Sequence, residues 1–179
     1  RLGETLSLLN KEPVFIITDS QVFKEVAAIV PKHLKLTSFS VLMARHKGIL
    51  PALTTGINAV KHLADGDTVL IAEGCTHHRQ CEDIGTVKIP RWLKTFTKKD
   101  IHIETSSGMT FPQDLSPYSL VIHCGGCMLN EKEMKYRVKE AKRQLRPIVN
   151  YGILIAYMNG ILERSAEAVP ELAFLKENS

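Results

Sequence analysis

Three cysteines and two histidines lie in two short clusters of the sequence, and they are the residues best suited to chemistry. The first cluster holds Cys75 and His77, and the second holds His123, Cys124 and Cys127. Thiolates and imidazoles are the side chains that bind zinc, copper and iron–sulfur clusters. The two clusters therefore predict a metal site, and no other part of the sequence has the pattern of an active site.

The ligand types leave two kinds of metal site open. Cys75, His77, Cys124 and Cys127 could close a tetrahedral zinc shell of three thiolates and one imidazole. The same cysteines suit an iron–sulfur cluster, because the two ligand sets overlap. A redox pair of Cys124 and Cys127 is conceivable, but the glycines between them and the preceding histidine favour metal binding.

The remaining histidines and the fourth cysteine have less certain roles. With three thiolates bound, His77, His78 and His123 cannot all be ligands of one four-coordinate metal, so some of them are expected to donate from outside its coordination shell. Cys81 follows Cys75 closely and could complete a set of four thiolates. We favour the alternative that Cys81 is a loop thiol, since it has no partner at a metal-ligand spacing.

The composition is that of a globular protein and excludes several classes. The chain has 179 residues, of which 44% are apolar and 23% charged, as in one ordinary domain or two small ones. Lys and Arg outnumber Asp and Glu by only 23 to 19, so we do not expect nucleic-acid binding. No apolar run reaches the roughly 20 residues of a membrane span, and no signal-peptide pattern opens the chain. Four cysteines without a secretory signal favour metal chemistry and a cytoplasmic protein.

Apolar runs alternate with helical patterns, which indicates parallel sheets flanked by helices. We expect strands over residues 14–17, 38–42, 68–72, 101–104 and 119–122. We expect helices over residues 18–30, 49–63, 131–145 and 148–167, and a loop from residue 83 that leads into a short helix near Trp92. The predicted fold class is α/β, with two small Rossmann-like domains. A turn at Asp65-Gly66-Asp67 divides the chain into residues 1–64 and 65–179.

The predicted strands bring the two clusters together. Cys75 follows the strand over 68–72, and Cys124 follows the strand over 119–122. Ligand sites of parallel sheets lie at the carboxyl ends of the strands, so both clusters are expected at one edge. Gly74 and the glycines after Cys124 leave room for an inorganic cluster near the backbone. The start of the helix capped by Asn130 would direct its positive end at the site.

Two helices are assigned by their charge and their apolar pattern. The helix over 131–145 carries several Lys and Arg residues, among them Arg137 and Lys142. We expect them to form a solvated face, with a docking surface for an acidic partner as the alternative. The apolar face of the helix over 49–63 is expected in the core, with a dimer interface as the alternative.

Several stretches resemble one known family. Residues 73–79, 82–91 and 123–128 are similar to the C-terminal region of the [FeFe]-hydrogenase maturation protein HydF family, including its pattern of Cys-x-His, a long spacer and His-Cys-x-x-Cys. Residues 18–21 and 36–40 resemble the middle, dimerisation region of that family. The resemblance covers essentially the whole chain, so it implies a dimerisation domain over 1–64 and an iron–sulfur cluster-binding domain over 65–179.

The resemblance implies a homodimeric scaffold and carrier. Such proteins bind a [4Fe-4S] cluster and receive a di-iron precursor made with the help of two radical-SAM maturases, which they deliver to apo-[FeFe]-hydrogenase. By position, Cys75, Cys124 and Cys127 would bind the cluster. The fourth iron would then have an exchangeable ligand, with His77, His123 or a group outside this chain as candidates.

The resemblance also implies what the chain lacks. Family members carry an N-terminal GTPase domain, but this sequence has no Gly-x-x-x-x-Gly-Lys-Ser/Thr phosphate loop and starts at Arg1. We therefore expect a fragment that is not an enzyme, with GTP bound only by the missing domain. The alternative functions are a protein-interaction module folded by structural zinc and a redox enzyme that uses its cluster for electron transfer.

Overall fold

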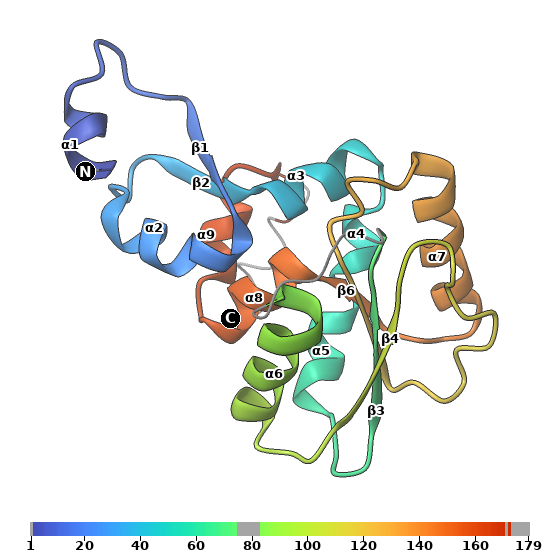
Figure 1. The fold of residues 1–179 in the computed structure, drawn as a ribbon. Helices are drawn as coiled ribbons and strands as arrows, with labels where there is room; N and C mark the ends of the chain where they lie inside the picture. Colours follow the sequence, from blue (N-terminus) through green and yellow to red (C-terminus); the bar gives the residue numbers. More distant parts are fainter. Residues whose placement is uncertain (1, 75–82, 171, 173–179) are drawn as a thin grey trace.

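Within residues 2–74, 83–170 and 172, which the computed structural model describes, four parallel strands form a central sheet and two more form a second sheet (Figure 1). The strands are β1 (Phe15–Thr18), β2 (Lys35–Ser38), β3 (Thr68–Ala72), β4 (His102–Ser106), β5 (Leu120–His123) and β6 (Ile148–Asn150). The smaller sheet pairs β1 with β2, and the larger has the order β4-β3-β5-β6. These parallel sheets confirm the predicted α/β fold class.

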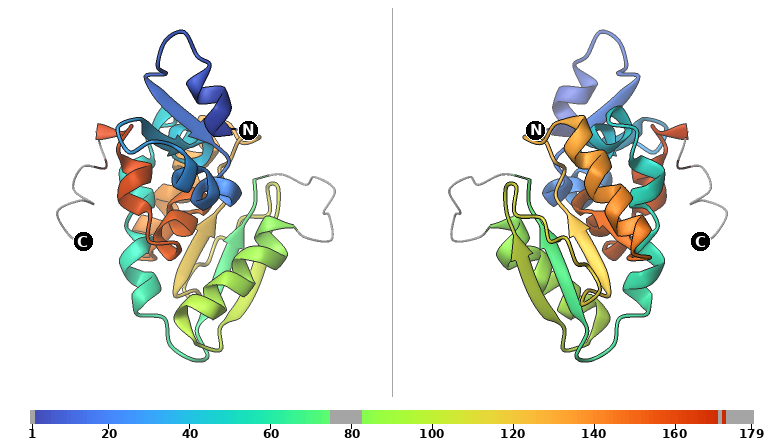
Figure 2. Two further views of the ribbon diagram at one scale, coloured as in Figure 1. Left: turned by 90° about the vertical axis from the view of Figure 1, so that its left-hand side faces the viewer. Right: turned by 90° about the vertical axis from the view of Figure 1, so that its right-hand side faces the viewer.

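Helices cover both faces of the larger sheet. The α-helices are α1 (Leu2–Ser7), α2 (Phe23–Ile29), α3 (Phe39–His46), α4 (Leu50–Leu53), α5 (Gly56–Lys61), α6 (Ile89–Thr97), α7 (Glu131–Arg143), α8 (Tyr151–Met158) and α9 (Leu162–Ala166). A short 3-10 helix, η1 (Ser20–Val22), precedes α2, and a π-helical turn, η2 (Ile84–Lys88), precedes α6. Helices α5, α6 and α8 lie over one face of the sheet, and α7 lies over the other (Figures 1 and 2). None of the helices described is long and apolar enough to cross a membrane.

Some predicted elements match the structure closely. The strands over 68–72 and 119–122 correspond to β3 and β5, which are almost entirely buried. Helix α7 has the predicted cap, because Asn130 Oδ1 accepts a hydrogen bond from the backbone N–H of Glu133 at 2.8 Å. The helix near Trp92 is α6, and the stretch from residue 83 that we expected to be a loop is partly the helical turn η2.

The predicted strand over 38–42 is wrong. The structure has strand β2 earlier in the chain, and helix α3 begins at Phe39. Polar and apolar residues alternate from 38 to 41, which is typical of a strand. Val41 and Ala44 are both buried, however, and a spacing of three residues places them on one face of a helix.

The predicted helices over 49–63 and 148–167 are also corrected. The first is split into α4 and α5 at Thr54 and Thr55, whose hydroxyls donate to carbonyls in the preceding turn. The second begins with the three-residue strand β6, which pairs with β5 before α8 starts. Helix α8 then ends near Gly160, which has a φ of +68° and so disfavours continuation of a right-handed helix.

The core is continuous across the predicted division of the chain at residue 64. Leu50, Leu53 and Ile57 of α4 and α5 belong to the same buried cluster as Val69 of β3 and Ile122 of β5. Helices α4 and α5 therefore pack on the larger sheet. The assignment of residues 1–64 and 65–179 to two domains stays a prediction.

Candidate metal centre

The carboxyl ends of β3, β5 and β6 lie side by side. The sheet register aligns Ala72 with His123, and His123 with Asn150. Just beyond these ends, the backbone N–H of Gly74 donates to the Sγ of Cys124 at 3.0 Å. The chain segments leading to the two predicted clusters therefore meet at one edge, as expected from the strands. Cys75, His77, His78 and Cys81 lie outside the described residues.

The Sγ of Cys124 accepts hydrogen bonds from two backbone N–H groups. The donors are Gly74, at 3.0 Å, and Gly126, at 3.3 Å. Cys124 is partly buried, so these donors act where water stabilises a charge less well. Hydrogen bonds to the ionised form of an acid favour that form. The arrangement suits a thiolate, which is the state of cysteine that binds metals.

Two glycines allow this geometry. A Cβ atom at Gly74 would lie 2.7 Å from the Cγ of Leu129, which is closer than packed side chains approach. Gly126 has a φ of +64°, and a Cβ there would lie 2.6 Å from the Sδ of Met134. We expected the glycines near Cys124 to make room for a cluster. Gly126 is needed in addition for the backbone turn and for its packing against Met134.

The loop over residues 124–129, here called the cluster loop, is held by a buried lysine. Lys47, at the end of α3, is only 5% exposed. Its ammonium donates to the carbonyl of Gly126 and, at 2.8 Å, to the carbonyl of Leu129. Cys127, between these two carbonyls, is exposed. The loop is therefore fixed at its backbone while a thiol stays at the surface, and nothing in the local sequence indicated this role for Lys47.

His123 is fully buried beneath the cluster loop, at the end of β5. Its Nδ1 lies 2.8 Å from the carbonyl oxygen of Cys124, and its Nε2 lies 3.2 Å from Nη1 of Arg137. The pKa of His123 is lowered to about 4, mainly by burial and also by the charges of Arg137 and Lys47, while the hydrogen bond to Cys124 opposes this shift. The ring is therefore neutral, and its partners assign the proton to Nδ1.

Arg137, at 0% exposed, is even more deeply buried than Lys47. Its Nε donates to Glu133 at 2.7 Å, its Nη2 donates to the carbonyl of Gly108, and its guanidinium stacks over Phe111 at 5.0 Å from the ring centroid. For this residue the predicted solvated face is wrong. Arg137 shares the buried face of α7 with Val138, a placement that the helical spacing of the apolar residues could have revealed.

A second group of buried polar side chains includes Glu73 and Asp83, which come just before and just after residues 75–82 in the sequence. Glu73 is 3% exposed and accepts a hydrogen bond from the Tyr151 hydroxyl at 3.4 Å. Burial, and then the charge of Glu73, raise the pKa of Tyr151. Asp83 accepts from the backbone N–H groups of Gly85 and Thr86 at 3.1 and 2.9 Å. Sequence reasoning missed this group, since its members are far apart in the chain.

Whether the site can hold a thiolate-bound cluster depends on the sulfur ligands and N–H donors that the cluster loop supplies. Among the residues that the structure describes, no three His, Cys, Asp or Glu side chains converge on a metal position. Cys124 and Cys127 are nevertheless available from one short loop, and Cys124 has two N–H donors directed at its sulfur. Backbone N–H groups around cysteine sulfur also stabilise the negative charge of an iron–sulfur cluster. The residues present therefore fit such a group.

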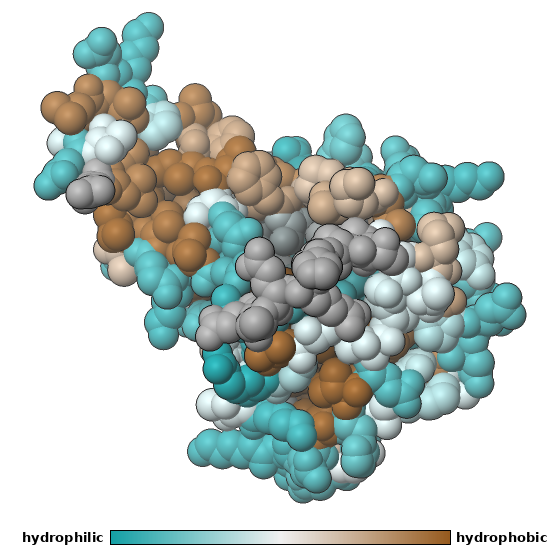
Figure 3. Space-filling model, viewed as in Figure 1, coloured by the Kyte–Doolittle hydropathy of each residue, from teal (hydrophilic) through white to brown (hydrophobic). Residues whose placement is uncertain are grey.

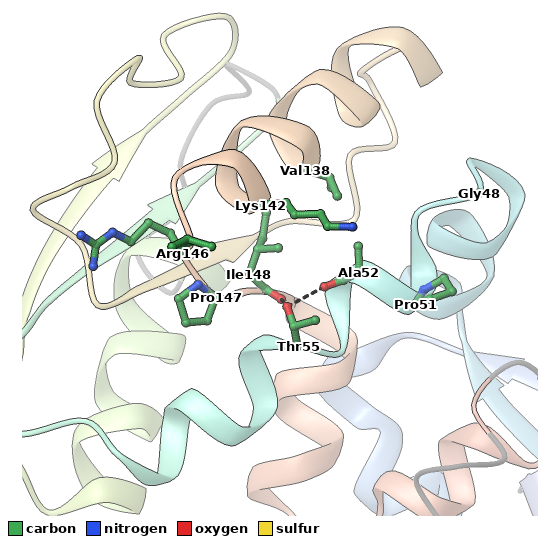
Figure 4. A pocket seen from close by; sticks show the side chains of 10 residues that line it. Gly48, Pro51, Ala52, Thr55, Val138, Lys142, Arg146, Pro147 and Ile148 are labelled. Atoms are coloured by element: carbon green, nitrogen blue, oxygen red, sulfur yellow. Dashed lines mark hydrogen bonds between the residues drawn. The ribbon is translucent and has the colours of Figure 1, made fainter.

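Two apolar surfaces lie away from this edge. Figure 3 shows apolar side chains gathered over the β1–β2 end, where Val14 is 84% exposed and Phe15 and Ile17 are also exposed. The second surface is a groove of about 660 Å³ between α4 and the end of α7 (Figure 4). Lys142 extends across it between Val138 and Ala52. The groove is lined by Gly48, Pro51, Ala52, Thr55, Val138, Lys142, Leu145, Arg146, Pro147 and Ile148.

Two protein-family models match the chain. The model of the hydrogen maturase F dimerization domain matches residues 1–48, and that of the hydrogen maturase F tetramerization domain matches residues 51–168. The second match contains the cluster loop, the buried Arg137 and every lining residue of the apolar groove except Gly48. No individual curated protein matches the chain.

Proposed function

Since the chain belongs to the hydrogen maturase F (HydF) family of hydrogenase maturation proteins, we propose that it is a [4Fe-4S]-binding scaffold. Cys75, Cys124 and Cys127 would bind the cluster. The observation that carries the proposal is the pair of N–H groups directed at the sulfur of Cys124. When bound, the cluster would supply an iron atom with an exchangeable coordination position.

The cargo of this scaffold is the di-iron precursor of the hydrogenase active-site cluster. The precursor, made with the help of two radical-SAM maturases, would be taken up here and delivered to apo-[FeFe]-hydrogenase. The exposure of Cys127, and of Met128 at 75%, supports this role, since a cargo and a partner can approach the cluster loop from solvent. Lys47 and Arg137 would hold the backbone of that loop through loading and release.

Both matching regions are self-association domains in this family, and the two apolar surfaces suggest where copies of the chain meet. The exposed side chains of β1 lie at the edge of a two-stranded sheet, which is a ready site for pairing with a second copy. Leu145, at the rim of the groove, is 88% exposed and has a φ of 55°. The positive φ belongs to the end of α7, where the N–H of Arg146 donates to the carbonyl of Ala141 at 2.8 Å. The exposed side chain would be buried if it inserted into the groove of another copy.

Anaerobic reconstitution tests the proposed cluster. The chain is incubated with iron and sulfide, desalted, and examined by absorbance and by EPR after reduction, with and without added imidazole. The scaffold proposal expects a [4Fe-4S] spectrum that changes when imidazole is added, because the fourth iron is open to exchange. A colourless protein that keeps one zinc ion instead would favour the structural-zinc alternative and refute the scaffold.

A further inference from the structure

We infer that Arg137 is a positioning residue that occupies Nε2 of His123, so that His123 fixes the backbone of Cys124 and is not itself a cluster ligand. The inference rests on the proposed function where it concerns the cluster. Its geometric part concerns the described residues alone. Arg137, His123 and Cys124 form a continuous chain of hydrogen bonds from α7 to the cluster loop.

Both ring nitrogens of His123 are in use. The carbonyl oxygen of Cys124 can only accept, so Nδ1, 2.8 Å away, must carry the proton. The Nε2 of a neutral ring then has one lone pair, and Nη1 of Arg137 donates to it at 3.2 Å. A metal would need that same lone pair. His123 can therefore bind iron only if the guanidinium of Arg137 moves away.

The surroundings of Arg137 hold the guanidinium in place. Glu133 accepts from Nε at 2.7 Å, the carbonyl of Gly108 accepts from Nη2, and the guanidinium carbon lies over the ring of Phe111. The side chain is 0% exposed, so water cannot replace a lost partner. Displacing Arg137 from His123 would also disturb these other contacts, which favours the observed arrangement.

The bond from Nδ1 of His123 transmits this constraint to the cluster loop. It fixes the carbonyl of Cys124 and hence the peptide plane that precedes Gly125. The same loop directs the N–H of Gly126 to the sulfur of Cys124. His123 is thereby excluded as the ligand at the exchangeable position on the cluster.

The first test uses the chain without metal. In 15N NMR spectra of chain labelled at histidine, wild-type His123 should show a protonated Nδ1 and a hydrogen-bonded, unprotonated Nε2. Arg137→Met should move the Nε2 resonance downfield, to the position of an imine nitrogen without a donor. The matched control is Arg143→Met on the same helix, since Arg143 is exposed and pairs with Glu140; it should leave His123 unchanged. An unchanged Nε2 in Arg137→Met would overturn the inference.

A second variant keeps the test valid if Arg137→Met does not fold. Arg137→Lys retains the charge, but a single ammonium cannot reach His123 and Gly108 together as the guanidinium fork does. We expect the same direction of shift, with circular dichroism confirming the fold. This readout needs no cluster, so it stands even if the scaffold proposal fails.

The last test uses the reconstituted chain with 15N-labelled histidine and pulsed EPR. His123→Gln should leave any strongly coupled histidine nitrogen signal as it is in the wild type. Loss of that signal would show His123 to be a ligand and overturn the inference.

Arg137→Met and His123→Gln should each lower the iron retained after desalting, and the double variant should lose no more than the worse single variant. If the iron losses of the two single variants add in the double variant, Arg137 and His123 act independently, which would contradict the inference.

Discussion

Replacing Gly126 with alanine is expected to destabilise the chain by about 2–4 kcal/mol. Two terms contribute. The φ of +64° lies in the left-handed region, where a Cβ costs roughly 1–2 kcal/mol. The new methyl would also lie 2.6 Å from the Sδ of Met134, and such overpacking costs about 1–3 kcal/mol. The flexible thioether of Met134 can yield somewhat, which places the sum below its upper limit.

The chain contains a matched control for the first term. Gly160 has a nearly equal φ of +68°, and nothing lies within 4 Å of a Cβ built there. Gly160→Ala should therefore cost only the conformational part, about 1–2 kcal/mol. The difference between the two variants isolates the contact with Met134.

Urea unfolding followed by far-UV circular dichroism measures both variants, provided that the slope with denaturant is unchanged. We expect Gly126→Ala to lose clearly more free energy of unfolding than Gly160→Ala. Equal losses would refute the reasoning, because they would mean that the cluster loop does not press against Met134. Gly126→Ala should also retain less iron after reconstitution, since the N–H of Gly126 donates to the sulfur of Cys124.

Three further predictions follow from buried or exposed side chains. The pKa of buried His123 is lowered from 6.5 to about 4, so the folded state disfavours the protonated ring. The free energy of unfolding should therefore be highest above pH 6.5 and should fall by about 3 kcal/mol as the pH is lowered to 4. Urea unfolding of His123→Gln, measured across this pH range, should lack that part of the pH dependence. Lys47→Met should lower the free energy of unfolding by about 2–4 kcal/mol, since two buried carbonyls of the cluster loop lose their donor, and an unchanged urea midpoint would contradict this. Leu145→Glu should weaken self-association in analytical ultracentrifugation, whereas Met109→Glu, at a site 73% exposed and outside the groove, should not.

The elements that sequence analysis predicted well are those with strong local signals. Helix α7 has a capping asparagine at its start, and β3 and β5 are short apolar runs buried on both faces. Strand β6 could not be predicted in this way. Its three residues become a strand because β5 offers a free edge, which is a contact between residues far apart in the chain. The division between α4 and α5 likewise depends on two threonine hydroxyls that compete for backbone carbonyls.

The candidate site shows the same limit. The position of Cys124 at the carboxyl edge of the sheet could be predicted, because each strand could be recognised locally and ligand sites of parallel sheets lie at that edge. The burial of Lys47 could not be derived from its neighbours in sequence, and for Arg137 the helical spacing indicates the buried face but not the partners that satisfy the charge. Each cation is stable in the interior because buried acceptors receive its protons, and these include carbonyl groups of other segments. Such partners become visible only once the fold brings them together.

The most direct test of the central claim compares the iron content of three reconstituted chains. Wild type, Cys124→Ala and Cys81→Ala are incubated anaerobically with iron and sulfide, desalted, and assayed for iron, sulfide and the absorbance of a [4Fe-4S] cluster. The account predicts that Cys81→Ala retains a cluster like that of the wild type and that Cys124→Ala retains none. A chain that keeps its cluster without the thiol of Cys124, or loses it without that of Cys81, would contradict the proposed ligand set.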